Sequence, residues 1–92
     1  MKKEIRYNYV YLFYDIEEPR VQKVFKICKK YLNHYQNSIF CGEITPTNIK
    51  KLEEELNSIV LGKDKITILK FIRKEDVCKT VLNKESETSI FL

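Results

Sequence analysis

The first regular feature of the chain is an apolar run, Tyr7 to Ile16, that contains neither glycine nor proline. It is dense in aromatic and β-branched residues, which favour strands. Its alternate positions form two sets, both mostly apolar: Tyr9, Tyr11, Phe13 and a final Asp15 on one side, and Val10, Leu12, Tyr14 and Ile16 on the other. Because both sides are apolar, the pattern predicts a central strand with both faces covered.

After Glu17 and Glu18 the apolar period lengthens to three and four residues, which predicts an amphipathic helix with Pro19 in its first turn. The apolar stripe of this helix consists of Val21, Val24, Phe25, Cys28 and Leu32. Its opposite side carries Lys23, Lys26, Lys29 and Lys30. On pattern alone, these lysines are explained by a helix face in contact with water.

The next stretch repeats this alternation of strand and helix. Residues 35–45 are typical of extended chain, and Gly42 predicts one kinked strand or two short ones. Thr45 and Pro46 are helix-start signals, and Gly62 is placed to end that helix. The apolar stripe between them is Ile49, Leu52, Leu56, Ile59 and Val60. Residues 65–72 predict a further strand.

The end of the chain has a weaker pattern. Val77, Cys78, Val81 and Leu82 recur at helical spacing. Residues 89–92, Ser-Ile-Phe-Leu, are the last strand candidate. We therefore expect one domain over residues 1–92, with a core of about residues 7–72 and an extension over 73–92 that carries a terminal strand.

The order of the elements predicts an α+β fold of the ferredoxin-like β-α-β-β-α-β type, with both helices on one face of an antiparallel sheet. The other face would then carry Tyr9, Tyr11, Phe13 and Asp15 without cover from its own chain. Three aromatic side chains left in water are unfavourable, so we expect this face to contact a partner, with a second copy of the chain as the first choice.

Composition narrows the range of functions. The chain has 92 residues, of which 17 are basic and 13 acidic, so its net charge of +4 permits nucleic-acid binding without demonstrating it. Three widely spaced cysteines argue against a disulfide framework and a zinc knuckle. No apolar run approaches the roughly 20 residues of a membrane helix, which predicts a cytoplasmic protein with no membrane partner.

Asp15 is the most informative single residue, because it follows an apolar strand and stands where the strand gives way to a loop. It could also simply cap the following turn or helix. His34 is the single histidine, and no serine or cysteine stands in a nucleophile-elbow motif where it could act as the nucleophile. No glycine-rich phosphate-binding motif is present either. An oxygen-ligated Mg²⁺ or Mn²⁺ ion at Asp15 is the remaining catalytic device, shared by two copies across a two-fold axis.

Several residues together resemble a known family. They are Tyr14-Asp15-Ile16, then Arg20 and Lys23, then Gln36, Ser38, Phe40 and Gly42-Glu43-Ile44-Thr45. In order and spacing they are similar to the CRISPR-associated Cas2 proteins, which are small subunits of CRISPR adaptation named endoribonucleases.

The resemblance implies a homodimer in which the two sheets face each other. Asp15 would be the metal-binding and catalytic carboxylate, and Arg20 would lie near the substrate. Ser38 and Phe40 would help to shape the cleft at the interface, and residues 89–92 would add a strand to the partner's sheet. With nucleic acid as a partner, Arg20, Lys23, Lys26 and Lys30 become candidate phosphate contacts.

The resemblance leaves two functions open. One is metal-dependent cleavage of single-stranded RNA or duplex DNA, and the other is a non-catalytic bridge between Cas1 integrase dimers during spacer acquisition. A toxin-type ribonuclease of similar fold is a further alternative. So is an RNA-recognition module that stacks bases on Tyr9, Tyr11 and Phe13, although its usual later-strand signature is missing.

Overall fold

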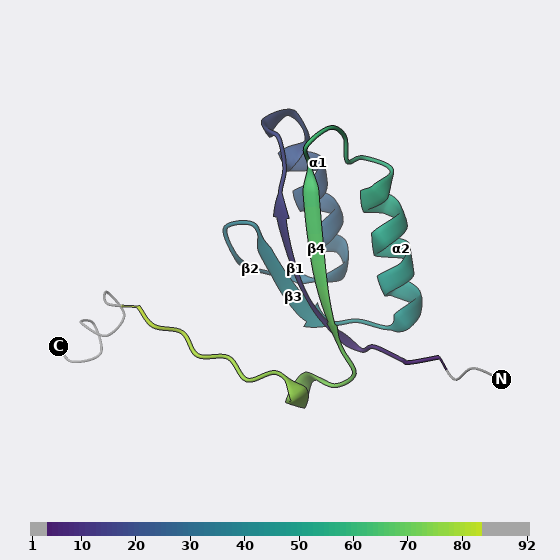
Figure 1. Ribbon diagram of the computed structural model, residues 1–92, viewed down its shortest axis with the longest axis vertical. Coiled ribbons are helices and arrows are strands. Elements are labelled where there is room, and N and C mark those ends of the chain that lie inside the picture. Colours follow the sequence, from purple (N-terminus) through teal and green to yellow (C-terminus); the bar gives the residue numbers. More distant parts are fainter. Residues whose placement is uncertain (1–3, 84–92) are drawn as a thin grey trace.

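The computed structural model describes residues 4–83, which form a four-stranded sheet and two α-helices (Figure 1). The elements follow the order β1 (Tyr9–Asp15), α1 (Glu18–Tyr31), β2 (Asn33–Gln36), β3 (Ile39–Glu43), α2 (Pro46–Asn57) and β4 (Lys65–Phe71), followed by a single 3₁₀ turn (Lys74–Asp76). None of the helices in this part of the chain is long and apolar enough to span a bilayer.

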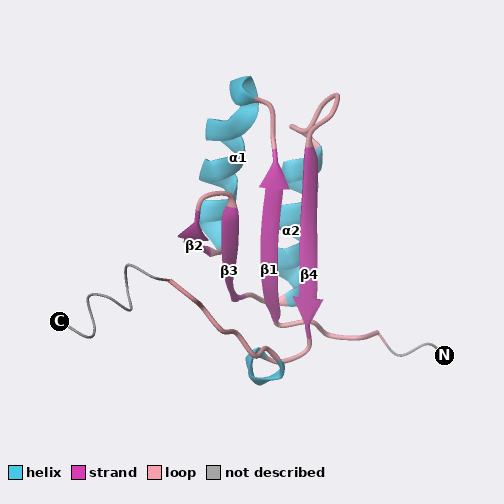
Figure 2. Cartoon of the chain, turned by 60° about the vertical axis from the view of Figure 1, so that its left-hand side comes forward, coloured by secondary structure: helices cyan, strands magenta, loops and turns pink. Residues whose placement is uncertain are grey.

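The strands lie in the order β2-β3-β1-β4, and every neighbouring pair is antiparallel. β1 is therefore central, as its two apolar sides predict. Both helices pack on one face of the sheet and leave the other without a helix (Figure 2). The predicted α+β, ferredoxin-like fold is confirmed.

The core lies between the sheet and the helices. β1 contributes Val10 and Leu12, and both are fully buried. The helices contribute Val24, Cys28, Leu52 and Leu56, and β3 contributes Phe40. The side of β1 that begins at Val10 is thus the helix-covered side, and Cys28, on the predicted apolar stripe of the first helix, is fully buried.

Local signals explain where the helices begin. The Thr45 hydroxyl accepts a hydrogen bond from the Asn48 N–H at 3.2 Å, which caps α2, and Pro46 occupies the first turn. α1 has Pro19 in its first turn, but its N-cap residue, Glu17, makes no side-chain cap. Gly62 does not end α2 directly; it adopts a left-handed conformation, φ 57°, in the loop that leads to β4.

The stretch predicted as one kinked strand or two short ones forms two strands, but the break is not at Gly42. β2 and β3 are joined by a turn at Asn37 and Ser38, and Asn37 has a positive φ of 42°. Asparagine tolerates the left-handed region better than most residues, which explains the position of the turn. Gly42 lies buried within β3, where an added Cβ would come 3.4 Å from Asn33 Nδ2 of the neighbouring β2.

The helical spacing over residues 73–83 does not produce an α-helix. Only Lys74–Asp76 is helical, as one 3₁₀ turn, and residues 77–83 have no regular secondary structure. Val81 and Leu82 are 58% and 86% exposed, so no apolar surface stabilises an amphipathic helix there. The strand predicted over residues 89–92 lies outside the described residues, and its pairing with a partner stays a prediction.

Candidate site on the open face of the sheet

The sheet face without helices, here called the open face, is built largely of aromatic side chains. The Tyr11 ring lies edge-on to those of Tyr9, Tyr35 and Phe71, with centroid distances of 5.9, 6.5 and 6.5 Å. Phe13 and Leu69 are 39% and 47% exposed on the same face. The predicted uncovered aromatic face is therefore present in the single chain, and it is a large apolar surface in contact with water.

The segment that follows the 3₁₀ turn reaches this face at its β2 side. Lys79 Nζ lies 4.1 Å from the Tyr35 ring centroid and 5.9 Å from that of Tyr11, in cation–π geometry. A hydrogen bond to Tyr11 raises the pKa of the Lys79 ammonium. Residues 79–83 and the sheet together line a hollow of about 490 Å³. The open face is thus overlaid only in part.

Asp15 is the last residue of β1 and lies exposed at one end of the open face. Its carboxylate makes no hydrogen bond or ion pair with any residue between 4 and 83. It does not cap α1, which was the alternative left open by the sequence, because the Glu17 N–H donates instead to Asp64 Oδ1 at 2.8 Å. Asp15 is therefore a carboxylate that has no polar partner within residues 4–83 and lies at the end of a largely apolar surface.

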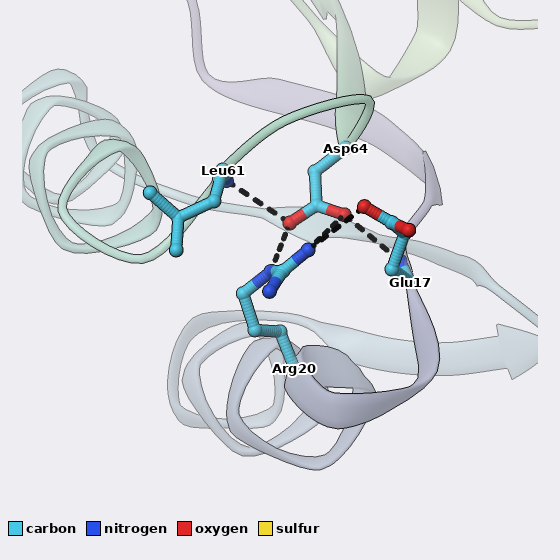
Figure 3. A network of polar contacts seen from close by, with 4 residues as sticks. All are labelled: Glu17, Arg20, Leu61 and Asp64. Atoms are coloured by element: carbon cyan, nitrogen blue, oxygen red, sulfur yellow. Dashed lines mark hydrogen bonds and ion pairs between the residues drawn. The ribbon is translucent and has the colours of Figure 1, made fainter.

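The loop beside Asp15 is held by a set of contacts that we call the loop clamp, formed by Glu17, Arg20 and Asp64 (Figure 3). The Arg20 guanidinium pairs with both carboxylates; its Nη2 lies 3.2 Å from Asp64 Oδ1 and 3.1 Å from Glu17 Oε1. The Leu61 N–H also donates to Asp64, at 3.1 Å. The clamp ties the β1–α1 loop to the α2–β4 loop.

The Asp64 side chain has no exposed surface, so its charge depends on these contacts. The hydrogen bond from Arg20, together with the N–H groups of Glu17 and Leu61, holds the pKa of the Asp64 carboxyl well below its usual range. Asp64 therefore stays ionised and links the two loops at neutral pH. Sequence reasoning missed this residue, and its only sequence signal is an acidic residue between Gly62 and a strand.

The structure divides the cations expected to contact nucleic acid into two groups. Arg20 is committed to the loop clamp, and Lys30 pairs with Glu55, which also accepts from the Tyr31 hydroxyl. Lys23 and Lys26 are exposed, and neither has an ion-pair partner among residues 4–83. Of the four candidates, these two are the ones whose ammonium groups are available to a ligand.

The structure separates the two expected cleft residues, because Ser38 lies in a turn beside the end of β1 whereas Phe40 lies in the core. The Ser38 carbonyl accepts the Tyr14 N–H at 3.1 Å from within the β2–β3 turn. Phe40 is fully buried on the helix-covered side, with its ring centroid 5.2 Å from that of Phe25 and 6.3 Å from that of Tyr14. Phe40 therefore supports β1 from within the core and does not line the open face.

Carboxylates suit Mg²⁺ and Mn²⁺, so Asp15 has the right chemistry for either ion. Within residues 4–83, however, no group of three or more His, Cys, Asp or Glu side chains could hold a metal ion. One chain thus supplies one carboxylate. The donor set fits a divalent cation only if a second copy brings its own Asp15 to the same place.

Comparison with known proteins adds an independent observation. The family described as CRISPR associated protein Cas2 matches residues 8–80. A protein named CRISPR-associated endoribonuclease Cas2 3, from Thermodesulfovibrio yellowstonii, is 40% identical over 86% of this chain and 91% of its own length. A Thermotoga maritima protein named CRISPR-associated endoribonuclease Cas2 is 41% identical, and the match spans 61% of this chain and 64% of that protein, slightly under two thirds.

Solved structures agree with these sequence matches. A crystal structure of a Cas2 protein superposes with a TM-score of 0.77 and 35% identity, over 87% of this chain and 92% of the other. The crystal structure of Streptococcus pyogenes Cas2 at pH 6.5 has a TM-score of 0.60 at 24% identity, over 88% of this chain and 93% of that one, and shows the shared fold. The chain therefore belongs to the CRISPR-associated protein Cas2 family.

Proposed function

We propose that the protein is a homodimeric subunit of CRISPR adaptation that binds nucleic acid and bridges Cas1 integrase dimers. The observation that carries this proposal is the open face, where aromatic side chains and one uncommitted carboxylate lie together. Pairing two open faces removes the exposed aromatic surface from water and leaves the helices outermost. The family membership supports a CRISPR role for such a dimer.

The outer helices supply the contacts to nucleic acid in this proposal. Lys23 and Lys26 lie on the exposed side of α1, away from the open face, and their charges are not used within the described chain. Each phosphate that such a lysine neutralises releases counterions, so binding weakens as salt rises. Arg20 pairs with Glu17 and Asp64 and so holds the loop next to Asp15.

A second function, metal-dependent cleavage of a phosphodiester, is favoured by Asp15 itself. Its carboxylate is exposed, fixed at the end of a central strand and unpaired within residues 4–83. In the dimer, two Asp15 side chains would hold one Mg²⁺ or Mn²⁺ ion. When bound, such an ion offsets phosphate charge and makes a water molecule more acidic. The relatives named endoribonucleases support RNA as one substrate.

The decisive experiment compares Asp15→Asn with a matched control, Glu43→Gln. Glu43 is an exposed carboxylate whose register partner is Tyr9, at the opposite end of the open face. Wild type and both variants would be confirmed as dimers by sedimentation and then incubated with labelled single-stranded RNA and duplex DNA in Mg²⁺, Mn²⁺ or chelator. We expect metal-dependent cleavage by the wild type and Glu43→Gln, and a loss of roughly 100-fold or more in Asp15→Asn.

Other results would exclude individual parts of the proposed function. If all three proteins fail to cleave, the enzymatic function is rejected, and spacer integration together with Cas1 becomes the test of the bridging function. Cleavage that continues in Asp15→Asn or in chelator would exclude the Asp15 metal site. A monomer that binds single-stranded RNA would exclude the homodimer and restore the RNA-recognition alternative.

A further inference from the structure

Strand register places a lysine beside Asp15. In the β1–β4 pair, Asp15 at the end of β1 is directly opposite Lys65 at the start of β4. Residues opposed in this way point to the same side of a sheet, with Cβ atoms about 4.5–5.5 Å apart. The same side of β4 carries Leu69 and Phe71, whose partners in β1 are Tyr11 and Tyr9. Lys65 therefore lies on the open face, adjacent to Asp15.

The charge of Lys65 is not used elsewhere in the described part of the chain. Its side chain is exposed and forms no ion pair with any residue from 4 to 83, Asp15 included. Neighbouring cations differ in this respect. Arg20 is held by Asp64, and Lys70, further along the same strand, pairs with Glu53 at 2.6 Å. Lys65 is thus a free cation next to a free carboxylate.

The loop clamp fixes the position of both residues. Asp64 directly precedes Lys65, and Glu17 lies two residues after Asp15. Because Arg20 holds Asp64 and Glu17 together, the two strand ends cannot separate without breaking these ion pairs, of which the one between Arg20 and Asp64 is partly buried. The backbone positions of Asp15 and Lys65 are consequently fixed next to each other.

We infer that Lys65 binds a backbone phosphate of the nucleic acid that reaches Asp15, an inference that rests on the proposed nucleic-acid function. A carboxylate alone repels a phosphodiester, and a cation at neighbouring Cβ distance offsets that repulsion. The ammonium acts as a point charge that tolerates different phosphate geometries, which suits binding to a backbone without sequence readout. A dimer would carry two such pairs.

The test measures binding without metal, so that cleavage does not enter. Wild type, Lys65→Gln, Lys65→Arg and Lys63→Gln would bind a labelled single-stranded RNA and a labelled duplex DNA in chelator, over a series of salt concentrations. Lys63→Gln is the matched control, because it removes the same charge two residues earlier, in the loop before β4 and outside the β1–β4 register. Circular dichroism and sedimentation would confirm that each variant keeps its fold and oligomeric state.

We expect Lys65→Gln to weaken binding about fivefold or more near 0.1 M salt. It should also lower the slope of log affinity against log salt by about 0.9 on duplex or about 0.7 on single strands. Lys65→Arg should restore both quantities, and Lys63→Gln should leave the slope as in wild type. Asp15→Asn should strengthen metal-free binding, because it removes the adjacent negative charge.

Two negative outcomes are distinguishable. If the wild type binds but Lys65→Gln and Lys63→Gln change affinity and slope equally, the inference about Lys65 is wrong while the proposed function stands. If the wild type binds neither nucleic acid at any salt concentration, the proposed function itself fails, and the role of Lys65 fails with it.

Discussion

The two faces of this sheet are built from the same strands, but the rest of the chain covers them to different extents. On the helix-covered face, Val10, Leu12 and Phe40 are fully buried, and the buried core cluster within residues 4–83 is entirely hydrophobic. On the open face, aromatic rings contact one another while Phe13 and Leu69 remain well exposed, and Asp15 and Lys65 lie at one end. A single chain buries the first face under its helices and leaves the second partly exposed to water.

Because of this difference, the residues of β1 that determine stability alternate with those expected to determine function. Alternate residues of β1 point to opposite faces, so a substitution at one position acts on the core and a substitution at the next acts on the surface left for a partner. Replacements on the covered face should therefore lower the free energy of unfolding of each chain. Replacements on the open face should act on association and on nucleic acid.

The largest effect is expected from Phe40→Ala, which empties a fully buried site next to Phe25 and Tyr14. Loss of a buried phenylalanine costs about 3–5 kcal/mol through lost burial and the cavity left behind. Denaturant unfolding would measure it. Phe13→Ala, on the open face, is the control and should cost less than half as much at low protein concentration, where pairing does not contribute. Equal losses would remove the distinction between the faces.

The loop clamp should make stability depend on acid. The lowered pKa of Asp64 means that its contribution is complete above the unfolded-state value of about 4 and is lost as the pH falls below it. Asp64→Asn should unfold at lower denaturant than wild type at pH 7, and it should lose less stability than wild type between pH 5 and pH 2. Unfolding midpoints measured across that range test both statements. Parallel pH curves would show that Asp64 does not titrate as described.

The lysines of α1 should matter for binding and hardly at all for folding. Lys23→Gln and Lys26→Gln should each change the unfolding free energy by no more than about 0.5 kcal/mol, because both side chains are exposed and unpaired within the described region. Each should lower the salt slope for duplex DNA by about 0.9. Lys30→Gln is the comparison, since Lys30 already pairs with Glu55, and its slope should change less.

The alkylation rates of the three cysteines compare the covered face with the open face without any substitution. Burial raises the pKa of the Cys28 thiol to about 12, so this cysteine of the covered face should resist alkylation at pH 8. Cys78 is exposed and should react fastest. Cys41 is half-buried opposite Tyr11 on the open face, so its rate should fall as protein concentration rises and the faces pair. Mass spectrometry of timed reactions would resolve the three, and a rate for Cys41 that is independent of concentration would argue against pairing.

Periodicity was sufficient to predict the two faces of β1, the apolar stripes of both helices and the order of the elements. These features depend on residues close together in the sequence, where the period directly reports which side is buried. The β2–β3 turn at Asn37 was mislocated to Gly42, because a glycine can serve close strand packing as well as a bend. The helical spacing over residues 77–82 was misleading, because a stripe forms a helix only where it can be buried.

The sequence was sufficient to predict Asp15 as a site residue but not to predict the residues that surround it. Asp15 is marked by its own strand, whereas Arg20 and Asp64 are 44 residues apart and meet only through the fold. The sequence therefore gives no sign of the ion pair between Arg20 and Asp64, and the predicted place of Arg20 near the substrate stays a prediction. Lys65 was equally hidden, because its place next to Asp15 depends on strand register, which one sequence does not specify.

The central position of β1 also has a consequence for the order in which the protein can be assembled during synthesis. β1 is synthesised before β4, yet Tyr9 pairs with Phe71, at the end of β4. Until β4 has emerged, one whole edge of the most aromatic strand lacks its hydrogen-bonding neighbour. Such long-range pairing slows folding, and an unpaired apolar edge invites contact with other chains. The nascent protein should therefore depend on rapid completion, or on chaperones, more than its small size suggests.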